Sequence, residues 1–561
     1  KMTAGYGNGP DIISSCSINV DRGEIFAMLG PNGAGKSTAM KAMLGLLKLK
    51  TGSISIDGKD ITNLSPQDRV KAGISFVPQT RNVFADLTVK ENLEVGAFLR
   101  EDDVDKVIDE IYELFPILNE KKLEADIGFI LYDIEDSKIL EAINPSKQYP
   151  LASITKLVTA LYAMEILGSR HVFTTTIEAI GEESGGILDG NLILRGGSDP
   201  TLSNDDLVIL VDNLWDNGLR KVDGKFIVDS SDVIYHGEID SEQPEYLSYN
   251  PSISGLNLNF NRVLFEWEKV GKLYSFQFQA RSAINNFDVS TTEVNFSKSN
   301  HKFKDDNYNG KNDKWVFDHS FLDKAKKRWL PVRNPDNYAA ELFWKIANKK
   351  GIDLPRPEIS HQITKGKILA KVQSEPLIKN IQLMLKYSNN LLSEIVGLSA
   401  TKKFSGDKKE IKASANIMGS WLENKIGNYQ GNFSDHSGLG VGSMMSSHEL
   451  IRFLKNSEWQ ASAINLMQSF KVKKTQSSTL KSYTNFIKVK TGTLNYVGNM
   501  AGYIETKSGR KLLFVILGSN LDQRNRLTKA DRDNPPEAKI WNKKIRSLQL
   551  DLIESWALRY N

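Results

Sequence analysis

The run Tyr149-Pro150-Leu151-Ala152-Ser153-Ile154-Thr155-Lys156-Leu157-Val158-Thr159-Ala160 contains a serine followed three residues later by a lysine. Residues three apart share one face of a helix, so the lysine amine can take the proton of the serine hydroxyl. Pro150 suits a helix start, and an apolar stripe follows at helical spacing: Leu157, Leu161, Met164 and Leu167. The stretch therefore predicts a nucleophile, Ser153, and its base, Lys156, on the first turn of a buried helix.

A lone Ser-x-x-Lys pair is most often a solvated helix face, so this prediction depends on two later motifs. Ser388-Asn389-Asn390 lies inside a second helical pattern, and Lys490-Thr491-Gly492-Thr493 ends a β-type run over residues 486–489. The three motifs in this order resemble those of the penicillin-recognising serine acyltransferases. An earlier Lys50-Thr51-Gly52 is excluded because it precedes the serine.

The composition is that of an ordinary protein with several domains. At 561 residues the chain can bury more than one core, and a net charge of +4 gives no argument for nucleic-acid binding. Cys16 is the single cysteine, which excludes an internal disulfide and a cysteine metal cluster, and the histidines lack metal-ligand spacing. No apolar run reaches the length of a membrane span, and residues 1–10 predict no signal peptide.

A second strong motif, Gly30-Pro31-Asn32-Gly33-Ala34-Gly35-Lys36-Ser37-Thr38, matches the template of the phosphate-binding P-loop. It follows a strand-like run over residues 24–29 and opens a helix over residues 39–47, which is the context that the motif requires. Its glycines let backbone N–H groups close on phosphate oxygens at a helix N-terminus. Lys36 is predicted to reach the β- and γ-phosphates of ATP, and Ser37 to bind Mg²⁺.

Residues 1–122 resemble the ATP-binding subunit of an ABC transporter, especially that of branched-chain amino-acid importers. Residues 52–58 match its early β-hairpin, residues 74–79 match the strand that ends in the Q-loop glutamine, and residues 87–93 match the segment after it. Tyr6 stands where that family stacks an aromatic ring on adenine. The resemblance implies a nucleotide site of Tyr6, Gly30, Asn32, Gly33, Gly35, Lys36, Ser37, Thr38 and Gln79, in which Ser37 and Gln79 bind Mg²⁺.

The ABC pattern stops near residue 118. The Leu-Ser-Gly-Gly-Gln signature, the Walker B strand with its Asp-Glu pair and the switch histidine do not follow. The Walker B carboxylates hold Mg²⁺ and polarise the attacking water, and the missing strands flank the P-loop strand in the family's sheet. We therefore expect residues 1–122 to be a truncated α/β fragment that folds only partly and does not hydrolyse ATP, although ATP and Mg²⁺ binding stays open.

From about residue 125 to the end, the chain resembles the D-alanyl-D-alanine carboxypeptidase/endopeptidase family, low-molecular-mass penicillin-binding proteins with a large insert. A strand over residues 127–133 and a return strand over 137–141 precede the Ser153 helix, as in that family. The 235 residues from Ser153 to Ser388 are too many for a class A β-lactamase core. Residues 192–202, 222–229 and 250–261 resemble motifs of the insert, and residues 433–439 its Asp-Gly-Ser-Gly-Leu turn with His436 in place of a glycine.

The predicted fold class is multidomain. An α/β P-loop fragment (1–122) precedes an α+β β-lactamase/transpeptidase-like domain in two parts (123–180 and 373–561), which carries a β-rich insert (181–372). Residues 499–504 and 512–517 are expected to be sheet strands and residues 538–558 a packing helix. Residues 298–314, rich in Lys, Asp and Asn, are expected to form a solvated loop.

The resemblance implies a mechanism with no metal or other cofactor. Ser153 attacks the D-Ala-D-Ala carbonyl, Lys156 is the base, and Ser388 relays a proton to the leaving D-alanine. Substrate binding falls to Asn390, Lys490, Thr491, Gly492 and Thr493, and the backbone N–H groups of Ser153 and Thr493 form the oxyanion hole. Peptidoglycan stem peptides and β-lactams are the expected partners.

Three functions stay open from the sequence alone. The leading one is a serine D-Ala-D-Ala carboxypeptidase, with endopeptidase action on cross-links as an addition. The second is an ATP-binding module with a passive second half, and the third is a β-lactamase or esterase on the same scaffold. Because ABC ATPases work in the cytoplasm and peptidoglycan peptidases in the periplasm, we hypothesise a fusion of two reading frames near residues 119–126, by deletion or by sequence assembly.

Overall fold

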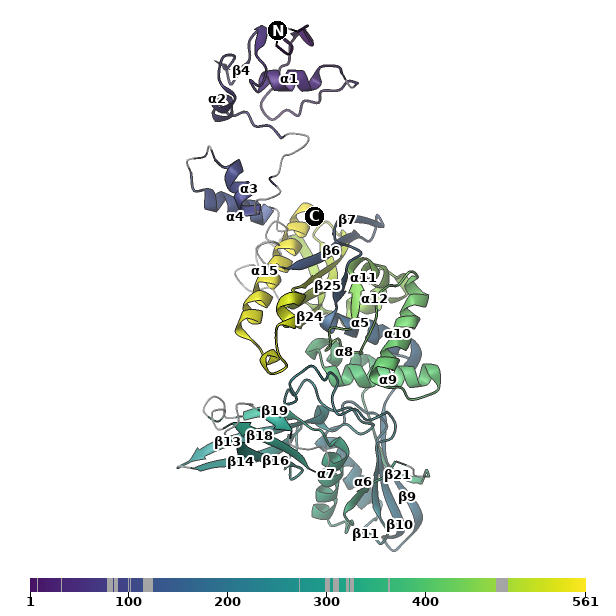
Figure 1. Cartoon of the computed structure of the whole chain (residues 1–561). Helices are drawn as coiled ribbons and strands as arrows, with labels where there is room; N and C mark the ends of the chain where they lie inside the picture. Colours follow the sequence, from purple (N-terminus) through teal and green to yellow (C-terminus); the bar gives the residue numbers. More distant parts are fainter. Residues whose placement is uncertain are drawn as a thin grey trace. The chain divides into compact units, whose positions relative to one another are not determined.

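The computed structural model describes the chain except for residues 8, 32, 78–83, 85–88, 99, 101, 115–124, 272, 298–302, 306–311, 319–321, 323–326, 362–363 and 471–482. The described residues form two compact units, Lys1–Tyr112 and Glu113–Asn561 (Figure 1). Among the described helices, none combines the length and the apolar character needed to cross a membrane. The domain boundaries given above stay predictions.

The first unit has a small core, in which Met2, Ala4 and Ile13 pack against Ala39 and Ala42 of helix α1. Its sheet has the antiparallel order β2-β1-β3, and β4 and β5 form the hairpin predicted near residues 52–58. The elements are β1 Met2–Ala4, β2 Ile13–Cys16, α1 Lys36–Met43, β3 Leu49–Thr51, β4 Ser55–Ile56, β5 Lys59–Asp60, α2 Pro66–Lys71, α3 Val89–Gly96 and α4 Val104–Leu114.

Two strands predicted in this unit are wrong. Residues 24–29 and 74–77 adopt no regular secondary structure, and Ile25, Leu29 and Val77 are 96%, 91% and 76% exposed. An apolar run forms a stable strand only between partners that bind its backbone groups and cover its side chains. No strand in the described part of the unit supplies those partners to either run.

The second unit is built on a six-stranded antiparallel sheet of order β23-β24-β25-β26-β6-β7. Strands from both ends of the unit meet in its centre, because β26 pairs with β6 along its full length. The strands expected at residues 127–133, 499–504 and 512–517 are confirmed. The bounds are β6 Asp126–Asp133, β7 Lys138–Ile143, β23 Gln468–Ser469, β24 Thr484–Leu494, β25 Val497–Thr506 and β26 Lys511–Ser519.

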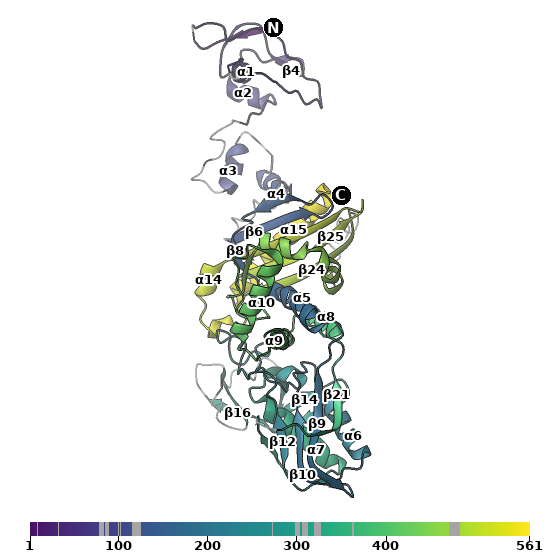
Figure 2. The same ribbon diagram turned by 90° about the vertical axis from the view of Figure 1, so that its right-hand side faces the viewer.

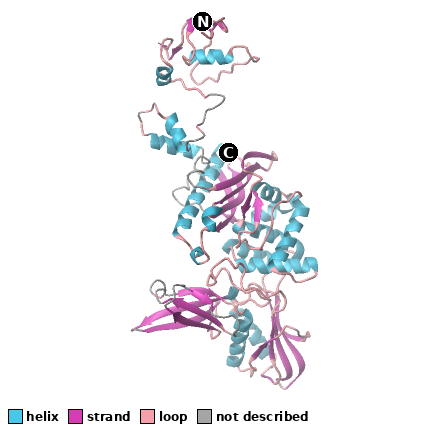
Figure 3. Ribbon diagram, in the orientation of Figure 1, coloured by secondary structure: helices cyan, strands magenta, loops and turns pink. Residues whose placement is uncertain are grey.

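Helices cover both faces of this sheet (Figures 1 and 3). On one face lies α15, which confirms the packing helix expected over residues 538–558. On the other face lies a helical layer around the buried helix α5. The bounds are β8 Gln148–Pro150, η3 Ala152–Ile154, α5 Thr155–Leu167, α8 Leu377–Tyr387, α9 Asn390–Ser405, α10 Ile411–Ile426, β22 Met444–Ser446, α11 Ser447–Leu454, α12 Ser457–Leu466, α14 Leu521–Asn525, η6 Ala530–Arg532 and α15 Pro536–Arg559.

A β-rich segment is inserted between α5 and α8, as expected. A sheet of order β20-β12-β10-β9-β21 packs against α6 and α7 (Figure 2), beside smaller sheets of order β15-β14-β13-β19 and β16-β18-β17. The bounds are β9 Thr174–Ser184, β10 Ile187–Arg195, α6 Asn204–Asp216, β11 Lys221–Val222, β12 Phe226–Asp229, η4 Asn259–Asn261, β13 Arg262–Val270, β14 Leu273–Arg281, β15 Asn286–Asp288, β16 Thr292–Ser297, β17 Phe303–Asp305, β18 Asp313–Asp318, β19 Lys327–Pro331, α7 Pro335–Lys350, β20 Pro357–Ile359 and β21 Lys367–Gln373.

Two further local predictions need correction. Residues 298–314 do not form a loop throughout, because β17 and the start of β18 lie in that segment: β17 pairs antiparallel with residues 315–317 of β18, and the start of β18 pairs parallel with β16. Ser388 does not lie inside a helix: α8 ends at Tyr387, Ser388 has a left-handed backbone (φ 53°), and α9 begins at Asn390. The apolar positions on both sides keep helical spacing, so the break is not visible in their periodicity.

We expect Trp556→Ala to lower the free energy of unfolding of the second unit by about 3–5 kcal/mol, because it leaves a cavity under α15. Trp556 is 1% exposed, packs against Phe129 and Phe514, and donates a hydrogen bond to Glu141 (3.1 Å). Urea unfolding followed by tryptophan fluorescence reports on this unit alone, since all nine tryptophans lie between residues 215 and 556.

Leu558→Ala is the matched control on the same helix, because Leu558 is 44% exposed. Its effect should stay within about 0.5 kcal/mol. Equal losses in the two variants would show that α15 is not the packing helix described above.

Candidate active site

Ser153 lies in the 3₁₀ turn η3, just before α5, and not on the first turn of the helix as the sequence suggested. The chain stays extended through Pro150 because β8 pairs with β22, and the Leu151 N–H then donates to the Ser443 carbonyl (2.9 Å). Ala152 takes a left-handed backbone (φ 48°), which turns the chain sharply before the serine. Strained backbone of this kind is found where a side chain must be held for function.

Lys156 reaches Ser153, and its amine is held by two further segments of the chain. Its Nζ lies 3.1 Å from Ser153 Oγ, 2.8 Å from Asn390 Oδ1 and 2.6 Å from the Ser437 carbonyl oxygen. Lys156 is fully buried. The first two predicted motifs therefore meet at one amine.

The third motif closes the other side of the site. Lys490 Nζ donates to Ser388 Oγ (3.2 Å) and to the Thr491 carbonyl (2.7 Å). The Lys-Thr-Gly residues lie inside β24, which runs on to Leu494, and do not end the strand as expected. A Cβ on Gly492 would lie 2.6 Å from the Leu151 oxygen and 3.0 Å from the Ser153 nitrogen, so only glycine lets β24 approach the serine turn this closely.

The charges of the two lysines are controlled mainly by burial. Burial lowers the pKa of Lys156 to about 8, while the carboxyl groups of Asp435 and then Glu394 act in the opposite direction. Burial and then the nearby Lys156 lower the pKa of Lys490 to about 7. Two amines that share a buried site do not both keep a proton easily, so a neutral amine near pH 7 is a property of this pair.

Two buried carboxyl groups stand behind Lys156. Asp435 accepts hydrogen bonds from the Gly438 N–H (2.6 Å) and the Gly440 N–H (2.9 Å), and Glu394 accepts one from the His436 N–H (3.1 Å). Burial raises the pKa of both. The sequence did not assign these carboxyl groups to the site, although Asp435 lies in the turn that it singled out.

His436 does not line the cleft and does not contact Ser153. Its ring is fully buried against Gly397, where a Cβ would lie 2.2 Å from the ring, and its Nε2 pairs with Ser414 Oγ (2.7 Å). Burial lowers the pKa of His436 to about 3, so the ring is neutral at physiological pH.

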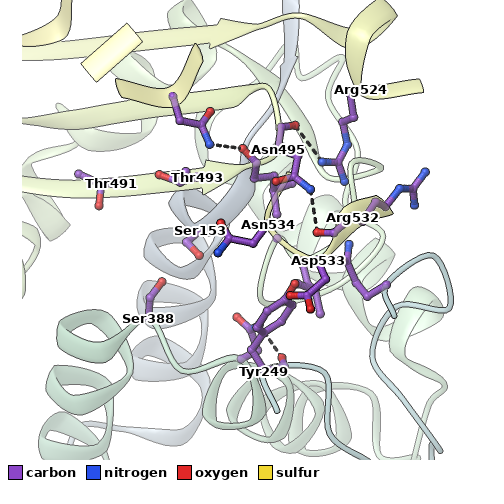
Figure 4. A pocket seen from close by; sticks show the side chains of 16 residues that line it. Ser153, Tyr249, Ser388, Thr491, Thr493, Asn495, Arg524, Arg532, Asp533 and Asn534 are labelled. Atoms are coloured by element: carbon purple, nitrogen blue, oxygen red, sulfur yellow. Dashed lines mark hydrogen bonds between the residues drawn. The ribbon is translucent and has the colours of Figure 1, made fainter. Parts of the chain in front are cut away.

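Ser153, Ser388, Thr491 and Thr493 open onto a cleft of about 540 Å³ (Figure 4). The insert supplies Tyr249, whose carbonyl accepts a hydrogen bond from Asn390 Nδ2 (2.8 Å). The cleft lining that the sequence missed consists chiefly of Tyr249, Asn495, Arg524, Arg532, Asp533 and Asn534. Of these residues, only Tyr249 could have been suspected from the sequence, because it directly precedes residues 250–261, which resemble a motif of the insert.

In the first unit, the P-loop glycines Gly30, Gly33 and Gly35 have positive φ, as expected for a phosphate-binding loop. Lys36 Nζ donates to the carbonyls of Gly30 (2.6 Å) and Pro31 (2.9 Å), so its amine occupies the loop itself. Ser37 is exposed and Thr38 is buried on α1.

Tyr6 lies beside α1, where its hydroxyl accepts a hydrogen bond from Lys41 Nζ (3.4 Å). The remaining predicted nucleotide ligands, Asn32 and Gln79, lie outside the described residues. Within the described ranges, no group of three or more His, Cys, Asp or Glu side chains could hold a metal ion.

The fold of the second unit and its Ser-Lys-Ser-Lys arrangement define a serine acyltransferase of the β-lactamase/transpeptidase class. More narrowly, the chain belongs to the D-Ala-D-Ala carboxypeptidase 3 (S13) family, whose model matches residues 112–534, about three quarters of the chain. The predicted carboxypeptidase resemblance and the hydrolase activity that it implied are thereby confirmed.

A relative with a similar sequence is the D-alanyl-D-alanine carboxypeptidase DacB of Haemophilus influenzae. It is 25% identical over 415 residues, which cover 70% of this chain and 85% of that protein. The crystal structure of penicillin binding protein 4 (dacB) from the same organism matches with a TM-score of 0.62 at 20% identity, over 77% of this chain and 99% of that chain. At this identity the structural match establishes the fold alone.

The N-terminal part of the chain matches a second family model, that of the ABC transporters, over residues 13–133. A probable branched-chain amino acid transport ATP-binding protein, LivF of Archaeoglobus fulgidus, is 40% identical over 119 residues. That match covers 21% of this chain and 50% of LivF. The chain thus spans about half the length of this ATP-binding relative, and the predicted resemblance to this family is confirmed.

Proposed function

We propose that this carboxypeptidase releases the terminal D-alanine of peptidoglycan stem peptides through an acyl-enzyme on Ser153. The observation that carries the proposal is the contact between Lys156 Nζ and Ser153 Oγ, 3.1 Å apart, with Asn390 and Ser437 fixing the amine. A neutral lysine at this distance can take the serine proton as Oγ attacks the carbonyl carbon.

The other residues of the three motifs follow in order. Ser388, within 3.2 Å of Lys490 Nζ, passes a proton to the leaving amine. Lys490, Thr491 and Thr493 bind the terminal carboxylate, Asn390 binds the substrate amide, and the N–H groups of Ser153 and Thr493 hold the oxyanion. Gly492 keeps β24 against Ser153 so that these donors surround one carbonyl. Water then releases the acyl group, and no metal takes part.

β-Lactams are proposed to acylate the same serine, because their strained amide mimics the D-Ala-D-Ala bond. The structure of Haemophilus influenzae penicillin binding protein 4 has also been described in complex with a β-lactam. A β-lactamase or esterase remains the alternative use of this scaffold, and the size of the insert favours the carboxypeptidase.

The decisive experiment treats the full chain with a fluorescent penicillin and maps the labelled peptide by mass. A stable adduct on the peptide that contains Ser153 is expected, and Ser153→Ala should abolish it because the nucleophile is gone. Ser420→Ala, an exposed serine on α10, should label like the unchanged chain. Release of D-alanine from a pentapeptide by Ser153→Ala would refute the assignment, and rapid release of hydrolysed penicillin would indicate a β-lactamase.

The rate of acylation should increase as the pH rises through about 8. Below the pKa of Lys156, which is about 8, the amine is protonated and cannot accept the serine proton. The apparent second-order rate constant of acylation is therefore expected to fall about tenfold per pH unit below that value. Tryptophan fluorescence over the same range checks that the chain stays folded, and a flat profile between pH 6 and 9 would exclude Lys156 as the base.

A second, separate proposal concerns the first unit, which we infer binds ATP with Mg²⁺ weakly and does not hydrolyse it. Lys36 is already hydrogen-bonded to the loop, and the run that should support the P-loop as a strand is exposed. We expect nucleotide binding that is weakened by Lys36→Ala and no phosphate release in a coupled assay. Magnesium-dependent turnover that Lys36→Ala abolishes would contradict this proposal.

A further inference from the structure

A second cleft, of about 450 Å³, adjoins the first, and Tyr249 lines both. The two clefts share Tyr249, Ser388 and Asn390 as lining residues, so they adjoin each other at the catalytic residues. The walls of the second cleft are largely apolar and include Pro251, Phe260, Leu383 and Leu391. The proposed mechanism gives this cleft no role.

Arg262 lines this cleft and lacks a polar partner. Its Nε is buried and has no hydrogen-bond partner among the described residues. Burial alone lowers its pKa, with no neighbouring carboxylate acting against that effect. The residue as a whole is partly buried, and a buried polar atom without a hydrogen bond calls for an explanation.

Stacking against aromatic rings accounts for only part of the environment of Arg262. The guanidinium lies 5.2 Å from the ring of Phe260 and 5.4 Å from that of Trp329. Such contacts stabilise the positive charge, but they supply no hydrogen-bond acceptor to the Nε–H group. Because arginine stays protonated, the charge persists, and an anion that enters the cleft can both neutralise it and accept hydrogen bonds from it.

The backbone holds Arg262 in place before any ligand arrives. The three residues before it, Asn259 to Asn261, all have left-handed backbones, which are costly for non-glycine residues. Asn259 Nδ2 donates to Asn204 Oδ1 (2.6 Å) and Asn261 Nδ2 to the Ser252 carbonyl (3.0 Å), and these buried bonds fix the turn. Phe260 and Arg262 are therefore preset on the cleft wall.

The opposite wall also favours an anion. The first turn of α9, from Asn390 to Leu392, lines the second cleft, and the N-terminus of a helix carries partial positive charge. Neither this turn nor the described lining contributes a carboxylate of its own. An apolar cleft with an unpaired guanidinium and a helix N-terminus suits a carboxylate on an aliphatic or peptide body.

We propose that the second cleft is a subsite for a further carboxylate of the peptide substrate, which Arg262 binds through its free N–H groups. This inference rests on the proposed function, because the bound peptide must also place its scissile bond at Ser153. The carboxylate is not the terminal one, which Thr491 and Thr493 hold. It is the α-carboxylate of the γ-linked D-glutamate, and the aliphatic part of that residue packs against Phe260 and Leu383.

The test measures equilibrium binding to the full chain carrying Ser153→Ala, so that no turnover occurs. Two pentapeptides ending in D-Ala-D-Ala are compared, identical except that the α-carboxyl group of a γ-linked D-glutamate is free in one and amidated in the other. The free carboxylate is expected to bind about tenfold more tightly or better, as charge-assisted hydrogen bonds of this kind provide. Arg262→Met should remove the difference, and Arg262→Lys should restore part of it.

Arg281→Met is the matched control, because Arg281 pairs with Glu266 on the same sheet and lies outside both clefts. It should keep the full preference for the free carboxylate. Equal binding of the two peptides by the Arg262 chain, or an equal loss for both in Arg262→Met, would overturn the proposal. The urea midpoint of Arg262→Met checks that it is folded.

The experiments distinguish an error in the proposed function from an error in the role assigned to Arg262. Absence of a penicillin adduct on Ser153 in the otherwise unchanged chain would refute the acyl-enzyme. The difference in affinity between the two peptides needs no catalysis, so it decides the role of Arg262 in either case.

Discussion

The structure of the acyltransferase half depends on the burial of one amine, that of Lys156. An ammonium group out of water must have every donor satisfied, and here three segments far apart in sequence supply the acceptors. The same segments bind one another: Thr159 of α5 and Ser393 of α9 both donate to the His436 carbonyl. Helices α5 and α9 and the turn around residues 435–440 thus form one hydrogen-bonded body around the amine.

Two glycines make this body possible. A Cβ on Gly438 would lie 1.8 Å from the Ala152 oxygen, and one on Gly492 would meet the backbone on both sides of the serine turn. Any side chain at either position would separate the turn or the strand from Ser153. Because a shift of roughly 1 Å can slow catalysis about a hundredfold, backbone contact is as important here as the reactive side chains.

The three motifs could be assigned to the active site from the sequence alone, because each is short and lies beside an element with a regular apolar pattern. It missed features that depend on what comes to lie beside a segment in three dimensions. Tyr249 and Arg262 line clefts together with residues of α8 and α9, which no local sequence pattern predicts; the only hint was that Tyr249 directly precedes residues 250–261. The left-handed break at Ser388 was missed for a related reason, since apolar spacing continues across it.

In the P-loop segment the motif was recognised correctly, but the strand predicted just before it, over residues 24–29, is not formed. A motif describes a few backbone positions, whereas a strand requires partners, and Ile25 and Leu29 have none among the described residues.

The second unit is well packed even at a position where its sequence departs from the family pattern. His436 replaces a glycine in the turn beside Lys156, yet its ring fits against Gly397 and bonds to Ser414. A bulky residue accommodated in this way indicates a core that is packed as a whole. Packing of this kind, more than agreement with a motif, is the physical reason to assign the activity of this chain to its second unit.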